Sequence, residues 1–277
     1  MSCPERDPCH RRPCLYVARL LGAERRRKQT PKGSRALTPF WQAVLVLRWF
    51  RGDKDVPGLG RDHRVSRATA YRHVDEGIDV LAAQAPDLHD VLDRARADGL
   101  AHLILDGTLL PADRCAEQTL SVKGEPIDLW YSSKAHRHVG NVQALSSPAG
   151  LPLWVSDVEP GSVHDLTAAR THLLAALYKA AADGLPTLAD SGYEGAGIGV
   201  LTPVKNPSDG QVLSIGNRTY NRLLRGLRGL GERGFALLKG RWRTLQHITA
   251  GPGRIGAITR AALVLTHFEH RHLPGIR

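Results

Sequence analysis

The sequence predicts an α/β protein in which a mixed sheet flanked by helices follows a small all-α region. After Gly99, short apolar runs alternate with turn residues, and two of these runs, HLILDGT and PTLADSGYEG, each reach an aspartate. An Ala- and Leu-rich helical segment lies between strand-like runs, whereas residues 37–85 show helical spacing alone. Strands interrupted by helices, after a purely helical start, are typical of this fold class.

The charge balance indicates a polyanionic partner. The 277 residues carry a formal net charge of +11, which favours association with nucleic acid. Residues 1–72 hold 17 Lys and Arg against 6 Asp and Glu, and residues 100–277 hold 19 against 14. Two basic centres predict two surfaces for double-stranded DNA, although a basic leader with an ordinary basic surface would give the same totals.

The composition also predicts where the protein works. The best apolar run, at 43–50, is broken by Arg48 and is far shorter than the roughly 18 residues of a spanning helix. The first residues lack the basic-then-apolar order of a signal peptide. With an Arg excess typical of GC-rich bacterial genomes, we expect a cytoplasmic, nucleoid-associated bacterial protein without a membrane partner.

Residues 1–36 are expected to form a basic, disordered leader. The segment ERRRKQTPKGSR clusters like charges and turn residues and offers little to bury. Cys3, Cys9 and Cys14 stand near His10, but their spacing matches no compact zinc finger. Reduced cysteines are therefore the favoured interpretation and a zinc site the weaker alternative.

Residues 37–85 are expected to form a helix-turn-helix DNA-binding domain. Thr38 and Pro39 begin one helix, LGRDHRV forms a short second one, and Ser66 caps a third. The third helix buries one stripe and presents the opposite face of its first turns to the major groove. That face carries Arg67, Thr69, Tyr71 and Arg72. The alternative is a scaffold bundle whose arginines are merely solvated.

Residues 86–99 are expected to be a polar linker helix, and residues 100–277 the main α/β domain. Here NVQALSS and LPLWVSDV flank a Pro-Ala-Gly turn and predict a hairpin. A helix is expected from His164 to about residue 182, followed by the strand that ends in Asp190.

Two aspartates follow strand-like runs in the same sequence setting. Asp106 and Asp190 would repel each other at one edge of the sheet unless a cation lay between them. Because carboxylate oxygens are hard ligands, this pattern predicts Mg²⁺ or Mn²⁺.

A third acidic residue stands alone in a basic segment. Glu232 is the only acidic residue from Gly210 to Phe268, in a predicted helix that begins near Arg218. A nucleic-acid-binding helix with one metal-ligating carboxylate explains this pattern, and the alternative is a salt bridge from Glu232 to Arg228 or Arg233. Offsets of −4 and +7 place Arg228 and Lys239 on the face of Glu232.

These segments together resemble a known family. HLILDGT, LADSGYEG and GERGFALLKGRWRTLQHIT, with GNVQ and PLWVSDVEPGSVHD, resemble the DDE (Asp-Asp-Glu) transposases of bacterial insertion sequences. The most similar group is the DDE superfamily endonucleases with a helix-turn-helix in front, and the resemblance covers about residues 37–270. It implies an RNase H-like core with one aspartate on the first strand, another after the fourth and a glutamate on a later helix.

The resemblance also implies a site and an activity. Asp106, Asp190 and Glu232 would be catalytic and would ligate two Mg²⁺ or Mn²⁺ ions, with no nucleotide cofactor. The DNA contacts implied in this domain are Lys134, Arg137, Arg228, Lys239 and Arg241. Arg225 stands where the family signature has a tyrosine. The activity would be cleavage at inverted repeats and strand transfer to target DNA by a homo-oligomer.

Three alternatives stay open. Glu194, four residues after Asp190, could replace Glu232 as the third ligand, and Asp165 is expected to stabilise a helix start rather than to act in catalysis. The chain could instead be a helix-turn-helix regulator or a decayed transposase without catalysis. It could also be an RNase H-like nuclease that lacks strand transfer.

Overall fold

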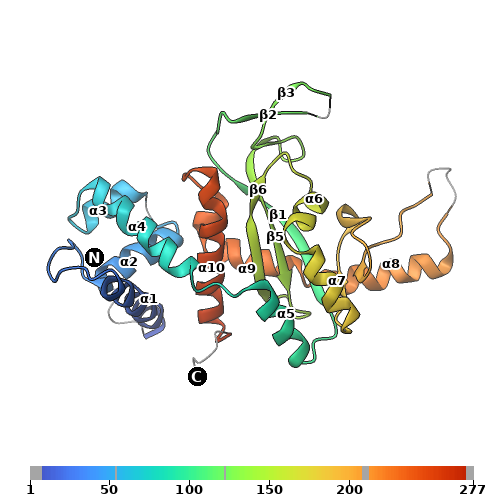
Figure 1. The fold of residues 1–277 in the computed structure, drawn as a ribbon, viewed down its shortest axis with the longest axis horizontal. Coiled ribbons are helices and arrows are strands. Elements are labelled where there is room, and N and C mark those ends of the chain that lie inside the picture. The colour runs from blue at the N-terminus through green and yellow to red at the C-terminus, as the bar shows by residue number, and fades with distance from the viewer. Residues whose placement is uncertain (1–7, 54, 122, 208–211, 273–277) are drawn as a thin grey trace. The chain divides into compact units, whose positions relative to one another are not determined.

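The computed structural model describes residues 8–53, 55–121, 123–207 and 212–272, without the side chains of residues 8–11 and 232. The described residues form two compact units (Figure 1). The first unit draws on the segments Met1–Ala85, Arg241–Gln246 and Ala257–Arg277, and the second on Pro86–Gly240 and His247–Gly256. No helix among the described residues is both long enough and apolar enough to cross a membrane.

The first unit is built from helices. Along the chain they are α1 (Pro8–Arg27), α2 (Pro39–Phe50), α3 (Val56–Asp62), α4 (Arg67–Ala82), the 3-10 helix η3 (Arg243–Gln246) and most of α10 (Ile255–Glu269). Two expected caps are confirmed, because Thr38 Oγ1 accepts from the Trp41 N–H and Ser66 Oγ accepts from the Thr69 N–H. Helix α3 begins earlier than expected, because Asp55 caps it by accepting from the Gly58 N–H.

Helices α2, α3 and α4 pack closely on one another. The expected stripe of α4 is buried and consists of Ala70, Val74, Ile78 and Leu81. At Gly77, an added Cβ would lie 2.5 Å from the Val46 side chain, so α2 and α4 approach each other where only glycine fits. This three-helix arrangement supplies the helices that a helix-turn-helix needs, while its DNA-binding role remains a prediction.

The expected disorder of residues 1–36 is wrong for residues 8–27, which form α1. Val17 and Leu21 are fully buried, and the Tyr16 ring stacks on Phe268 with centroids 4.5 Å apart. Arg25 Nη2 donates to Gln42 Oε1 at 2.6 Å. The many arginines of this segment suggested disorder, although its apolar residues recur at helical spacing. Burial of these apolar residues against the other helices stabilises α1. Cys3 and the side chains of Cys9 and His10 lie outside the described residues.

The second unit is organised around a mixed sheet (Figure 1). Its strands are β1 (Leu103–Pro111), β4 (Tyr131–Ser132), β5 (Arg137–Ser146), β6 (Pro152–Pro160), β7 (Thr187–Leu188) and β8 (Val200–Leu201). The strand order is β4-β5-β1-β7-β8, with β6 also paired to β5. Strand β5 is antiparallel to β1 and β6, whereas β7 is parallel to β1 and β8. A separate hairpin pairs β2 (Gln118–Leu120) with β3 (Pro126–Asp128).

Helices cover both faces of this sheet. On one face Leu103 and Leu105 of β1 share a buried cluster with residues of α5 (Leu88–Ala97), α6 (Asp165–His172) and α7 (Leu174–Ala182). Ile104 alternates to the opposite face, where its side chain meets Gly231 just before α9 (Glu232–Arg241). The remaining helices are α8 (Ile215–Arg228) and the 3-10 helices η2 (Ser191–Tyr193) and η4 (Pro252–Arg254).

Two predicted helices are interrupted. The helix expected from His164 to about residue 182 splits into α6 and α7 at Leu173, whose φ of −149° is not helical. The basic helix expected from Arg218 splits into α8 and α9 around Gly229–Gly231. An added Cβ at Gly231 would lie 2.5 Å from Ile104 Cγ2, so the chain passes too close to β1 for any larger residue.

The fold class is confirmed as a mixed α/β sheet flanked by helices and preceded by helices, in the RNase H-like arrangement. The packing units differ from the expected segments in three places. The linker helix α5 packs within the second unit, and residues 241–246 and 257–272 belong to the first. The functional domain limits remain a prediction.

Candidate active site

The sheet brings Asp106 and Asp190 to the same edge. Strand β7 runs parallel to β1 with Ile104 opposite Leu188. Continued by two residues, this register sets Asp190 opposite Asp106. The chain then turns into η2, where Asp190 Oδ1 accepts from the Gly192 N–H at 2.8 Å. Asp106 therefore lies within β1, which continues to Pro111, and not at the strand end that the sequence predicted, whereas Asp190 follows the short parallel strand β7 beside it.

Arg228 approaches these carboxylates from the end of α8. Its Nη2 lies 4.0 Å from Asp190 Oδ2, and its side chain is only 17% exposed. The Arg228 guanidinium also interacts electrostatically with Asp106 and favours its ionised form. Arg228 thus brings a positive charge close to the two carboxylates, and its contact with DNA stays a prediction.

Asp106 is hard to ionise in the protein without metal. Its pKa is raised to about 6, chiefly by burial and in smaller part by the charges of Asp190 and Asp165, against the opposing effect of Arg228. A hydrogen bond from the Gly107 N–H, 3.1 Å long, also favours the ionised form. Acidic groups that repel each other in a partly buried site are the donors that a divalent cation stabilises. The residues present therefore fit Mg²⁺ or Mn²⁺.

Glu232 is the first residue of α9, next to Gly231 and its close contact with β1. Its side chain lies outside the described residues, so its expected role is not tested. Among the described side chains, no three His, Cys, Asp or Glu residues are grouped to hold a metal ion. The alternative ligand Glu194 forms an ion pair with Lys205 and is half exposed.

Lys239 is tied to β1 immediately beyond the aspartate. Its Nζ donates to Thr108 Oγ1 at 2.5 Å and to the Leu109 carbonyl at 3.3 Å. Burial lowers the pKa of Lys239, while the negative charge of Asp106 opposes that effect. Arg228 and Lys239 therefore both lie near Asp106, although the break between α8 and α9 means that they do not share one helix face.

The other predicted DNA contacts are spread over the two units. On α4, Arg67, Tyr71 and Arg72 are exposed, whereas Thr69 is partly buried and accepts from Ser66 Oγ. In the second unit, Lys134 and Arg137 are exposed at the start of β5.

Arg241 differs from these residues. It lies in the first unit, where its guanidinium donates two hydrogen bonds to the Glu269 carboxylate, from Nε at 2.8 Å and from Nη2 at 2.6 Å. It also stacks over Trp242. This bidentate pair satisfies the side chain within the protein and weakens the expectation that Arg241 contacts DNA.

Sequence reasoning gave no role at the site to four residues that lie near the aspartates. Asn141 and Gln143 are buried on β5, Tyr193 is buried in η2, and Asp165 starts α6. Asn141 Nδ2 donates to Asp165 Oδ1 at 2.9 Å, so this carboxylate does more than stabilise a helix start. The available signal was the alternation of Asn141 and Gln143 on one face of an otherwise apolar strand.

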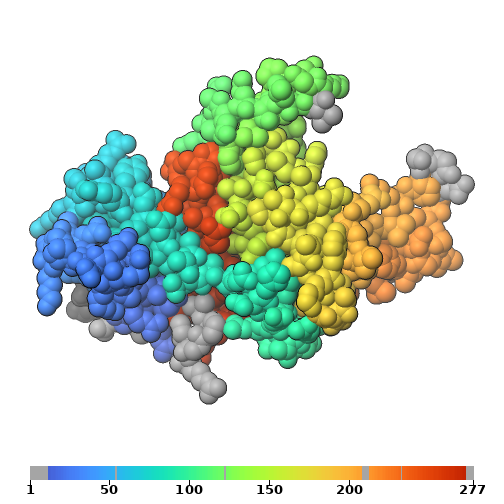
Figure 2. Space-filling model, viewed as in Figure 1, coloured from blue at the N-terminus to red at the C-terminus, as the bar shows by residue number. Residues whose placement is uncertain are grey.

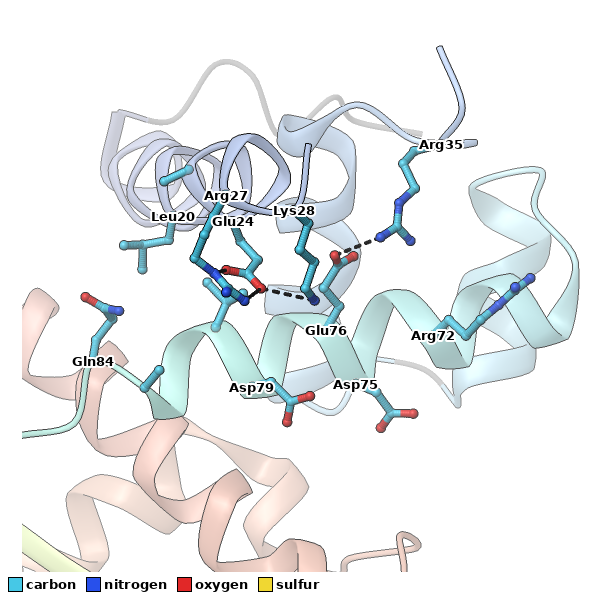
Figure 3. A pocket seen from close by; sticks show the side chains of 13 residues that line it. Leu20, Glu24, Arg27, Lys28, Arg35, Arg72, Asp75, Glu76, Asp79 and Gln84 are labelled. Carbon is cyan, nitrogen blue, oxygen red and sulfur yellow. Dashed lines mark hydrogen bonds and ion pairs between the residues drawn. The ribbon is translucent and has the colours of Figure 1, made fainter. Parts of the chain in front are cut away.

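A groove of about 980 Å³ lies in the first unit, between α1 and α4 (Figure 3). Several of its acidic and basic side chains pair with one another. Glu24 pairs with Arg27 at 2.7 Å and with Lys28 at 3.0 Å, and Arg35 pairs with Glu76 at 3.1 Å. The groove is therefore not the uniformly basic surface that DNA requires.

The fold and the site define a class of protein with an RNase H-like sheet, one aspartate within a central strand and a second aspartate just after the parallel strand beside it. Comparison with protein families matches residues 105–267, more than half of the chain, to the family described as DDE superfamily endonuclease. The chain belongs to this family, which supports nuclease or transposase-type activity on DNA and the general use of divalent metals. A search of curated proteins returns no match.

Proposed function

We propose that the protein is the transposase of a bacterial insertion sequence, which binds the ends of the element, cuts a DNA strand and joins it to target DNA. The parallel register of β1 and β7, which sets Asp106 opposite Asp190 inside the matched region, is the observation that carries this proposal. Membership of an endonuclease family supports the cleavage step.

Asp106, Asp190 and Glu232 would hold two Mg²⁺ or Mn²⁺ ions, and no nucleotide cofactor is needed. The bound ions would supply Lewis-acid stabilisation to the phosphoryl group under attack. Arg228, whose Nη2 lies 4.0 Å from Asp190, would bind a non-bridging oxygen of the same phosphate. Lys239, anchored to Thr108, would keep a positive charge beside Asp106.

Two displacements at phosphorus account for the reaction. In the first, the oxygen of water attacks the phosphate at the end of the element, and the bond to the 3′-oxygen breaks to leave a 3′-hydroxyl. In the second, that 3′-hydroxyl attacks a target phosphate and displaces the 3′-oxygen of the target strand. One phosphodiester bond forms as another breaks, so strand transfer needs no energy source.

Two described surfaces support binding to double-stranded DNA. The first turns of α4 expose Arg67, Tyr71 and Arg72, at the end of a helix that a helix-turn-helix would insert into the major groove. Helix α8 exposes a row of arginines along one face, at residues 218, 222 and 225, and this row ends at Arg228. In Figures 1 and 2, α8 extends from the rest of the second unit.

None of the three exposed α8 arginines forms an ion pair with a described residue. A helix rises about 1.5 Å per residue, so the row from Arg218 to Arg228 covers about 15 Å and leads toward Asp190. Such a row fits a DNA backbone that enters the site. Synapsis of two ends would require a homo-oligomer.

The test is cleavage of supercoiled plasmid DNA that carries the ends of the element, with Mg²⁺, Mn²⁺ or EDTA. We expect metal-dependent nicking that Asp190→Asn abolishes while DNA binding persists. Nicking without joined products would instead favour an RNase H-like nuclease without strand transfer. Specific binding without any cleavage would favour a regulator or a decayed transposase.

A further inference from the structure

A chain of buried hydrogen bonds runs beside the two aspartates. Tyr193 Oη donates to Gln143 Oε1, Gln143 Nε2 donates to Asn141 Oδ1 at 2.8 Å, and Asn141 Nδ2 donates to Asp165 Oδ1 at 2.9 Å. Tyr193, Gln143 and Asn141 are each no more than 1% exposed. Three buried polar side chains on one path are costly unless every one of them is satisfied.

The donor and acceptor of each hydrogen bond in this series follow from the last residue, Asn141. Asn141 Nδ2 also donates to the Val163 carbonyl at 3.0 Å, and a carbonyl oxygen can only accept. The amide nitrogen of Asn141 must therefore face Val163 and Asp165, which leaves its oxygen for Gln143. The Gln143 oxygen then faces Tyr193, whose hydroxyl has to donate. Every hydrogen bond of this series thus points a donor toward Asp165 and fixes the position of its carboxylate.

Gly107 gives Asp165 access to the strand that carries Asp106. An added Cβ at Gly107 would lie 2.7 Å from Asp165 Oδ1 and 2.9 Å from the Tyr193 hydroxyl. Only the absence of a side chain at the residue after Asp106 leaves room for this carboxylate. Asp165 comes from α6, on the other face of the sheet from α9, and its carboxylate lies against β1 at Gly107 on that face.

The second oxygen of Asp165 lies near the turn that carries Asp190. The position that a Cβ of Gly192 would take lies 2.9 Å from Asp190 Oδ1 and 3.9 Å from Asp165 Oδ2. Among the described residues, the ion-pair partner of Asp165 Oδ2 is Lys134 Nζ, at 4.0 Å and on a side chain that is 82% exposed. One oxygen of Asp165 therefore accepts from Asn141, whereas the other lies near the turn that carries Asp190.

We propose that Asp165 is a further acidic residue of the site, which raises the affinity of Asp106 and Asp190 for a divalent cation and is positioned by Asn141, Gln143 and Tyr193. This inference rests on the metal-dependent function proposed above. A fixed carboxylate whose charge acts on Asp106 adds negative potential where the cation binds. Outer partners of metal ligands typically contribute 10- to 100-fold to metal affinity.

The test is titration of the metal-free, full-length protein with Mn²⁺ by isothermal calorimetry, in the absence of DNA. We expect Asp165→Asn to weaken Mn²⁺ binding about 10- to 100-fold and Asp165→Glu, which retains the charge, to restore part of the affinity. Asp98→Asn is the matched control, since Asp98 is an exposed acidic residue of the same unit and its loss changes the net charge equally. Asp98→Asn should bind Mn²⁺ with the same affinity as the unaltered protein.

A second variant covers the case in which Asp165→Asn does not fold. Gln143→Met interrupts the hydrogen-bond chain without a change of charge, and we expect several-fold weaker Mn²⁺ binding. The inference would be overturned if a folded Asp165→Asn or Gln143→Met variant bound Mn²⁺ with the affinity of the unaltered protein. In the same experiment, Asp106→Asn should still abolish Mn²⁺ binding. If the unaltered protein neither binds Mn²⁺ nor cuts DNA, the proposed function itself fails.

Discussion

Asp106 should destabilise the metal-free protein at neutral pH, so its replacement by asparagine is expected to stabilise the fold while it abolishes cleavage. The pKa of Asp106 rises from 3.8 to about 6 in the folded protein. One pKa unit corresponds to about 1.4 kcal/mol. Ionisation of Asp106 therefore costs the folded state up to about 3 kcal/mol, and partial exposure to solvent reduces this to about 1–2 kcal/mol.

The pH dependence has a definite sign. A carboxyl whose pKa is raised on folding contributes its full stability below the unfolded value of about 4, and this contribution is lost as the pH rises through about 6. The advantage of Asp106→Asn should therefore be complete at pH 8 and absent near pH 4. Asparagine can keep the hydrogen bond from the Gly107 N–H, because its side-chain oxygen accepts as the carboxylate does.

Thermal unfolding in EDTA at several pH values measures this effect. A gain of 1–2 kcal/mol raises Tm by about 2–8 °C in a unit of this size, and Asp98→Asn serves as a control that should show no such pH dependence. Mg²⁺ or Mn²⁺ should stabilise the unaltered protein but not Asp106→Asn. A variant that is less stable than the unaltered protein at pH 8, or a difference independent of pH, would refute the reasoning.

Three further predictions concern Gly107, the row of arginines on α8 and the cap of α4. Gly107→Ala forces a methyl group against Asp165 and Tyr193, so we expect a loss of about 1–3 kcal/mol in the free energy of unfolding and slower nicking. Gly226→Ala, with open space around it, should show neither effect. Replacement of the three exposed α8 arginines by glutamine should lower the salt slope of DNA binding, measured by fluorescence anisotropy, by about 0.9 for each lost phosphate contact. Leu223→Gln on the opposite side of α8 should leave that slope unchanged, and an unaltered slope in the triple variant would exclude the row as a DNA contact. Ser66→Ala removes the side-chain cap of α4 and should cost about 1 kcal/mol in chemical denaturation, whereas no change would mean that the cap is not used.

Local patterns predicted most of the elements that carry the site. Apolar runs that end in aspartate predicted β1 and β7, and the cap residues Thr38 and Ser66 predicted where α2 and α4 begin. These features depend only on residues that are close in the sequence, so one amino-acid sequence is enough to predict them. The pairing of Asp106 with Asp190 required the further step that β1 and β7 are parallel neighbours.

The features that the sequence did not predict depend on contacts between distant segments. Helix α1 is stabilised by burial of Val17 and Leu21 in the first unit, although its arginines suggested disorder. The break before Glu232 exists because Gly231 passes over Ile104, which is distant in the sequence. Asp165 approaches β1 closely because Gly107 has no side chain, and helical periodicity gives no indication of this contact.

The most direct test of the central claim is cleavage of end-labelled DNA that carries the inverted repeat, with Mg²⁺ or Mn²⁺, by the unaltered protein and by Glu232→Ala. The account predicts metal-dependent nicking at the repeat boundary, lost in Glu232→Ala although DNA binding persists. Equal cleavage by both proteins would contradict the assignment of Glu232 and direct attention to Glu194. If both proteins bind the DNA and neither cleaves it, the result would contradict the proposed transposase activity.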